Sequence, residues 1–152
     1  MYTCQDIAEY LLALVDEEVE ELICNLKLQK LVYYAQGFYL ALNDKPLFNE
    51  PIEAWAHGPV VKELYQKYRS NGASGIPRPE NIDLSKYDKE TQDFLSEIYK
   101  LFGQYSGWKL REFTHGEAPW RNTYNIRHDG IISQDEMKEY FKTRIENVEE
   151  KH

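Results

Sequence analysis

Four histidines are the residues whose chemistry would first suggest a catalytic or metal site: His57, His115, His128 and His152. His115 stands two residues before Glu117, and an imidazole beside a carboxylate is suited to general acid–base catalysis. A single His–Glu pair is nevertheless unspecific, because imidazoles also bridge backbone groups at helix ends. A small hydrolase or nuclease that uses His57, His115 and Glu117 is therefore one hypothesis, and structural histidines are the simpler one.

Metal binding and covalent catalysis find no matching pattern in the sequence. A zinc site needs three or four converging ligands, and the chain has neither HExxH nor a cysteine pair with metal spacing. Cys4 and Cys24 lie near acidic residues that disfavour a thiolate. No Gly-x-Ser-x-Gly and no glycine-rich phosphate loop occurs. We therefore expect no catalytic residue, no metal and no cofactor.

The composition is typical of one folded, acidic domain. The chain has 152 residues, of which 42% are hydrophobic and 14% aromatic, with twelve tyrosines; this is too apolar for disorder and predicts a single compact domain over residues 1–152. The net charge of −8 makes nucleic acid an unlikely partner and is compatible with a basic protein partner, although solubility alone also explains it. No apolar run could span a bilayer and no secretory signal is visible, so we expect no membrane contact and a cytoplasmic protein with reduced cysteines.

Hydrophobic periodicity predicts a mainly α (α+β) fold with about six helices. A helix that starts near Leu26 and ends near Leu42 is apolar on two sides, which predicts a central position. Only a narrow sector around Lys27, Lys30 and Tyr34 is left for water. Gly37 in its middle predicts the close approach of another element.

The other elements follow from local signals. Thr3 followed by Asp6 predicts a capped first helix. The segments 47–49 and 52–56 predict one small antiparallel β-hairpin, and the helix after it is predicted to begin at Gly58-Pro59. Later helices are predicted at about 89–102, after Ser106, and after a capping box of Ser133 and Glu136, whereas 70–87 is predicted to be a loop and 121–132 to be irregular.

Three blocks together resemble a known family. They are LKLQKLVYYAQG at 26–37, IEAWAHGPVV at 52–61, and the segment from Thr114-His115 through Pro119-Trp120. In this order and spacing they resemble the Panacea domain, also called the SocA-like or phage-associated GepA-type domain, over about residues 3 to 145. The resemblance implies an antitoxin of a toxin–antitoxin system, often carried by phages or mobile elements, that neutralises its cognate toxin by direct contact.

The same resemblance implies the partners. The toxin is expected to be encoded by the adjacent gene. The SocA type acts instead as a proteolytic adaptor that delivers its toxin to the Clp protease, so this route stays open as an alternative. Some members carry an added DNA-binding domain, which we do not expect here, and the oligomeric state is left open.

The resemblance supplies signature positions and no catalytic residues. These positions, which either contact a toxin or hold the fold, are Lys27, Gln29, Lys30, Tyr33, Tyr34, Trp55, His57, Gly58, Pro59, Thr114, His115, Glu117, Pro119 and Trp120. Tyrosine is a frequent anchor of protein interfaces, and not all of Tyr33, Tyr34, Tyr65, Tyr68 and Tyr99 can be fully buried. The helical wheel predicts that binding occurs around Lys27, Lys30 and Tyr34, or on the loops.

Overall fold

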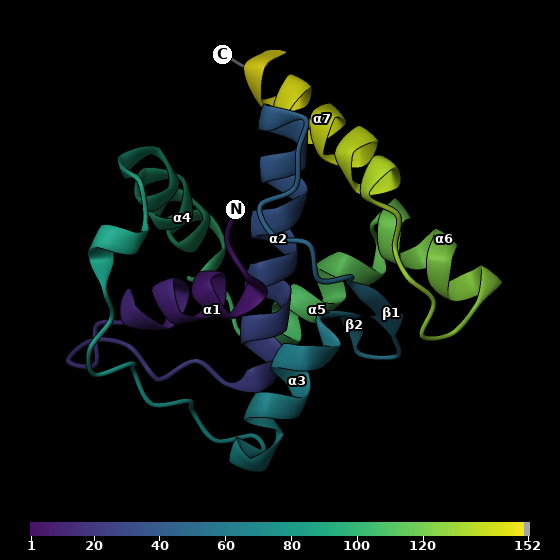
Figure 1. Cartoon of the computed structure of the whole chain (residues 1–152). Coiled ribbons are helices and arrows are strands. Elements are labelled where there is room, and N and C mark those ends of the chain that lie inside the picture. Colours follow the sequence, from purple (N-terminus) through teal and green to yellow (C-terminus); the bar gives the residue numbers. More distant parts are fainter. Residues whose placement is uncertain (151–152) are drawn as a thin grey trace.

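Helix α2 (Asn25–Asn43) is the axis around which the other elements pack. The computed structural model describes the backbone of residues 1–150 and the side chains of residues 1–146, so His152 lies outside the described residues. Figure 1 shows α2 running through the middle of the molecule, where it contacts five other helices and strand β2. The central position predicted from its apolar surface is confirmed.

Seven α-helices and two strands make up the described part of the chain, which confirms a mainly helical fold with one small sheet. Besides α2 they are α1 (Cys4–Ala13), β1 (Glu53–Trp55), β2 (Gly58–Val60), α3 (Lys62–Tyr68), α4 (Lys89–Phe102), α5 (Gly107–His115), α6 (Ala118–Ile126) and α7 (Gln134–Glu150). Short 3-10 turns occur at Arg69–Asn71 and Leu84–Lys86. Among the helices described, none is both long and apolar enough to cross a membrane.

The predicted helix caps and the predicted bounds of one helix are confirmed. Thr3 and Asp6 form a reciprocal capping box at the start of α1, and Ser106 caps α5. Helix α4 has the predicted bounds. The Oγ of Ser133 accepts the backbone N–H of Glu136. A Cβ at Gly37 would collide with the ring of Phe141 on α7, which confirms the predicted close approach.

The predicted outward sector of α2 is wrong. Lys30 and Tyr34 are 0% exposed, and Lys27 is mostly buried. The sector is covered because α5, β2 and α7 all pack against α2. The Nζ of Lys30 donates to the Pro59 carbonyl at 3.0 Å, and the Tyr34 hydroxyl donates to Glu117 at 2.8 Å. These partners come from segments distant in sequence, which a helical wheel does not contain.

The hairpin is also displaced from its predicted position. Strand β1 pairs antiparallel with β2, with Glu53 opposite Val60, and the segment 47–49 is not a strand. That segment bonds to a helix side chain instead: Gln36 donates to the Phe48 carbonyl at 2.7 Å and accepts the Leu47 N–H at 2.8 Å. The hairpin prediction was therefore right for one arm and wrong for the other.

Helix α3 begins at Lys62 rather than at Gly58-Pro59, because both residues belong to β2. Gly58 has a φ of +108°, and a Cβ there would lie 2.6 Å from the Cε of Lys30. This backbone conformation and close approach both favour glycine. The turn therefore brings the backbone of β2 directly onto the Lys30 side chain.

The prediction of an irregular segment at 121–132 is wrong for its first half. Helix α6 extends to Ile126, with Pro119 in its first turn, and only Pro119 and Trp120 are buried in it. Two buried positions are too few to produce an amphipathic pattern. The following segment then adds to the free edge of β1, where Ala54 exchanges backbone hydrogen bonds with Asp129 and Gly130.

Candidate functional site

The signature residues meet where the middle of α2 contacts the hairpin, α5 and the start of α6. Lys27 is at one edge of this region, with its Nζ donating to the Gly103 carbonyl at 2.6 Å. Gln29 is buried and accepts the Val61 N–H at 2.9 Å. Trp55 is half-buried and His57 is exposed at the hairpin turn. The blocks that are separate in sequence therefore form one continuous region in space.

Lys30 is the buried cation of this region. Among the described residues its Nζ has one hydrogen bond, to the Pro59 carbonyl, and Gly58 and the Thr114 hydroxyl lie close by. Burial, followed by the neighbouring positive charge of Arg111, lowers the pKa of Lys30 from 10.5 to about 7. The Thr114 hydroxyl donates to the Arg111 carbonyl at 2.9 Å within α5.

Arg111 and His115, both on α5, lie beside Lys30. The Nε of Arg111 and the Nε2 of His115 are buried and have no hydrogen-bond partner among the described residues. Burial, followed by the charge of Arg111, lowers the pKa of His115. The guanidinium of Arg111 lies 4.5 Å from the ring centre of Trp108, which is 57% exposed. The sequence analysis missed Arg111 and Trp108, although their spacing of one helical turn was a usable signal.

Glu117 is the buried anion of the region, at the start of α6. Its carboxylate accepts the hydroxyls of Tyr33 at 3.1 Å and Tyr34 at 2.8 Å, and the Nη1 of Arg144 lies 3.3 Å away. Burial raises the pKa of Glu117 from 4.5 to about 7, against the opposing effect of these three donors. The carboxylate thus joins α2, α6 and α7 through a satisfied set of hydrogen bonds.

A cavity of about 780 Å³ lies beside this carboxylate. Glu117 and Arg144 are among its polar residues, and Phe38, Phe102 and Phe113 are among its aromatic ones. The rings of Tyr34 and Phe102 stack at 4.1 Å. Mostly apolar walls with a few polar groups are typical of binding pockets.

The predicted imidazole–carboxylate arrangement is not assembled. Among the described residues, neither His57 nor His115 forms a hydrogen bond to Glu117, whose donors are two tyrosines and an arginine. His115 stacks on Trp120 at 4.1 Å instead. The indole Nε1 of Trp120 donates to the Trp55 carbonyl at 2.7 Å. His115, Pro119 and Trp120 therefore connect α5, α6 and the hairpin.

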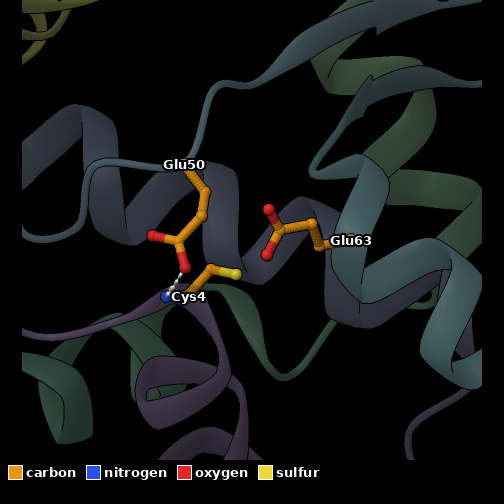
Figure 2. Close-up of side chains that lie close together, drawn as sticks. All are labelled: Cys4, Glu50 and Glu63. Carbon is orange, nitrogen blue, oxygen red and sulfur yellow. Dashed lines mark hydrogen bonds between the residues drawn. The ribbon is translucent and has the colours of Figure 1, made fainter.

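A second cluster lies at the start of α1 (Figure 2). Cys4, Glu50 and Glu63 place one thiol sulfur and two carboxylate oxygens within 4.8 Å of one another. The sequence analysis missed this group because its members are distant along the chain. Burial and then Glu50 raise the pKa of the Cys4 thiol. The uncharged thiol that results is a poor metal ligand, because metals bind the thiolate.

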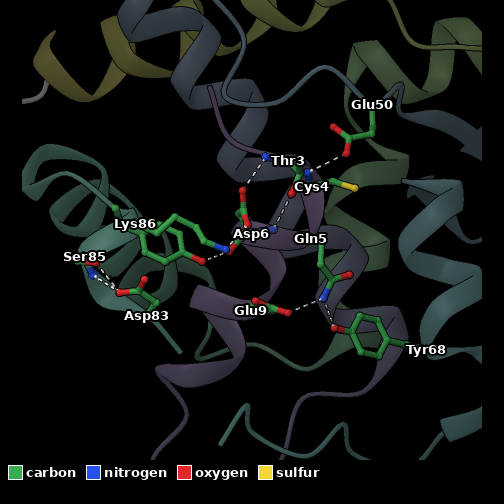
Figure 3. A network of polar contacts seen from close by, with 11 residues as sticks. Thr3, Cys4, Gln5, Asp6, Glu9, Glu50, Tyr68, Asp83, Ser85 and Lys86 are labelled. Carbon is green, nitrogen blue, oxygen red and sulfur yellow. Dashed lines mark hydrogen bonds and ion pairs between the residues drawn. The ribbon is translucent and has the colours of Figure 1, made fainter. Parts of the chain in front are cut away.

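The same corner is used to attach α1 to the rest of the molecule (Figure 3). Glu50 accepts the backbone N–H of Cys4 at 3.1 Å. Asp6 forms an ion pair with Lys86 at 3.0 Å, and Gln5 donates to the hydroxyl of Tyr68 at 2.8 Å. Through Glu50, the cluster therefore connects the start of α1 to the segment before β1.

The comparisons with known proteins agree on one family. The chain matches the family model described as "Antitoxin SocA-like, Panacea domain" over residues 28–121. It is 46% identical over 109 residues to Antitoxin SocA of Caulobacter vibrioides (strain NA1000 / CB15N), an alignment that covers 64% of this chain and 58% of that protein. The chain therefore spans less than two thirds of the length of that relative. No solved structure matches the chain.

Proposed function

Because the chain belongs to the family of SocA-like Panacea domains, we propose that it is an antitoxin that neutralises a toxin by direct binding. The partner is the product of the adjacent gene, and both proteins act in the cytoplasm. The chain acts through its surface and not through a reaction, since Glu117 and His115 are engaged in structural contacts.

The observation that carries this proposal is the position of the family match. Residues 28–121 include most of α2, the hairpin, α5 and the start of α6, which together form the central region of the molecule. The polar groups of Gln29, Gln36 and Glu117 in that region are engaged by partners within the chain. The shared residues thus build a rigid scaffold, and a rigid scaffold lets its exposed surface bind with little loss of conformational entropy.

Co-expression with the adjacent gene tests the proposal. The neighbouring product alone should stop growth, and the wild-type chain should restore growth and co-purify with that product. Rescue in cells without the Clp protease supports sequestration, whereas rescue that depends on Clp indicates delivery for proteolysis. A neighbouring product that is harmless, or one that stays toxic and unbound, contradicts the proposal.

The variant Glu117→Gln tests whether the chain acts by binding or by catalysis. The amide keeps an acceptor for the tyrosine hydroxyls but cannot act as a general acid or base. A binding module should therefore keep its rescue activity in this variant, provided that the variant is folded. An enzyme that uses the Glu117 carboxylate would lose rescue while staying folded.

A further inference from the structure

We propose that the outer face of α5 around Trp108 and Arg111 is the surface that receives an acidic segment of the toxin. This inference rests on the proposed function, because it assumes that a protein partner is bound. It specifies the surface of the chain that makes the contact and the charge of the partner segment that binds there.

The first support is the exposed pair itself. Trp108 is 57% exposed, although α5 buries Leu110 on its opposite side. The guanidinium of Arg111 lies over the Trp108 ring at 4.5 Å. Such stacking limits the motion of the arginine and leaves its fork of N–H groups oriented to bind a carboxylate. Tryptophan and arginine are also the residue types that most often anchor protein interfaces.

The second support is a positive charge without a counter-ion. Within the described part of the chain Arg111 forms no salt bridge, although other basic residues do. Burial, followed by the charge of Arg111, lowers the pKa of the neighbouring Lys30 and His115, so the guanidinium is the group of this cluster that keeps its charge near neutral pH. A carboxylate bound to the guanidinium would supply the missing counter-ion.

The wider charge distribution favours an acidic protein segment over a nucleic acid. The chain carries a net charge of −8, which repels a polyanion whose phosphates extend beyond the α5 surface. A short acidic segment on an otherwise neutral or basic protein needs only the local positive charge. The proposal therefore requires acidic residues in the contacting segment and makes no demand on the overall charge of the toxin.

The test is titration calorimetry of the full chain with the purified product of the adjacent gene. Arg111→Gln removes the charge and Trp108→Ala removes the exposed ring, and each should weaken binding by about tenfold or more. Arg111→Lys keeps the charge and should recover part of the loss. The matched control is Lys109→Gln, which removes a positive charge from the neighbouring position of α5, where Lys109 is paired with Glu112; it should change affinity by no more than about twofold. Thermal unfolding confirms that each variant is folded.

The outcomes separate the two proposals. A wild-type chain that does not bind the neighbouring product contradicts the proposed function itself. Wild-type binding that is unchanged in folded Arg111→Gln overturns only the assignment of the α5 surface. The same holds if neutralising the acidic residues of the partner leaves binding intact, or if Arg111→Gln abolishes the binding of duplex DNA while binding of the neighbouring product is unchanged.

Discussion

Two buried charges, Glu117 and Lys30, show opposite ways of placing an ionisable group inside this small protein. Glu117 accepts from two tyrosines and lies against an arginine. Among the described residues, Lys30 donates to one carbonyl, and the cation Arg111 lies nearby. Burial moves the pKa of each group to about 7. The difference is that the Glu117 carboxylate is matched by three donors, whereas neither Lys30 nor its neighbour Arg111 forms a salt bridge within the described part of the chain.

This contrast separates scaffold from surface. The matched carboxylate connects three helices and has the features of a structural element. The guanidinium of Arg111, which has no salt bridge among the described residues, lies over the exposed Trp108, and it is there that we place the partner. Each prediction below tests one side of this comparison.

The largest effect is expected for Glu117→Ala. Removal of the carboxylate takes away the acceptor of the buried Tyr33 and Tyr34 hydroxyls and of the Nη1 of Arg144. The free energy of unfolding, measured by urea denaturation, should fall by about 3 to 4 kcal/mol. The control is Glu112→Ala on α5, an exposed position that among the described residues forms one ion pair, with Lys109. Equal effects in the two variants would show that Glu117 is not a structural connection.

Gly58→Ala tests the Lys30 side of the comparison. The new Cβ combines an unfavourable positive φ with close contacts to Lys30 and Thr114. We expect a loss of about 2 to 3 kcal/mol in the free energy of unfolding. Gly72→Ala is the matched control, because it also has positive φ but no atom within 4 Å of the added Cβ. If the free energy of unfolding falls equally in the two variants, close contact with Lys30 does not contribute to the loss in Gly58→Ala.

The free energy of unfolding should change with pH in opposite directions for Glu117 and Lys30. The pKa of Glu117 rises from 4.5 to about 7 on folding, so the folded chain binds more protons in this range and stability falls as pH increases through it. The pKa of Lys30 drops from 10.5 to about 7, so the unfolded chain binds more protons above about pH 7 and stability rises there. The total change in the free energy of unfolding should be on the order of 3 kcal/mol for Glu117 and on the order of 5 kcal/mol for Lys30 across these pH ranges.

Two variants test whether Glu117 and Lys30 cause these changes in stability with pH. Glu117→Gln should flatten the fall below about pH 7, and Lys30→Met should flatten the rise above it. Urea denaturation at a series of pH values measures both. A fall that persists in Glu117→Gln, or a rise that persists in Lys30→Met, would assign the titration to other groups.

The smallest effect is expected for Lys109→Gln. Its ion pair with Glu112 spans 3.4 Å between side chains that are about half exposed, and such surface pairs contribute little. The free energy of unfolding should change by less than about 0.5 kcal/mol. A larger loss would mean that the Lys109 charge contributes to folding, and Lys109→Gln would then be a poor control for Arg111→Gln.

Sequence patterns predicted those parts of the fold that depend on neighbouring residues. The capping box of Thr3 and Asp6, the start of α5 at Ser106 and the bounds of α4 all follow from local signals. Helix α6 was missed because only two of its residues are buried. The hairpin was displaced because Gln36, distant in sequence, supplies the bonds that a strand at Leu47 would have needed.

The sequence identified several residues of the site but did not predict how they contact one another. The family blocks pointed to Tyr33, Tyr34 and Glu117, but their union with Arg144 depends on how α7 packs against α2. Lys30 was placed toward water because its acceptor, the Pro59 carbonyl, belongs to a strand that the sequence analysis assigned to a helix. Arg111 and Trp108 lie between the signature blocks, so the resemblance did not mark them.

The most direct test of the antitoxin account is the mass of the complex formed by two purified proteins with no protease present. Size-exclusion chromatography with light scattering should show the full chain and the product of the adjacent gene eluting together, at a mass that fits a fixed ratio of the two. Separate elution at concentrations where the chain rescues growth would contradict neutralisation by direct binding.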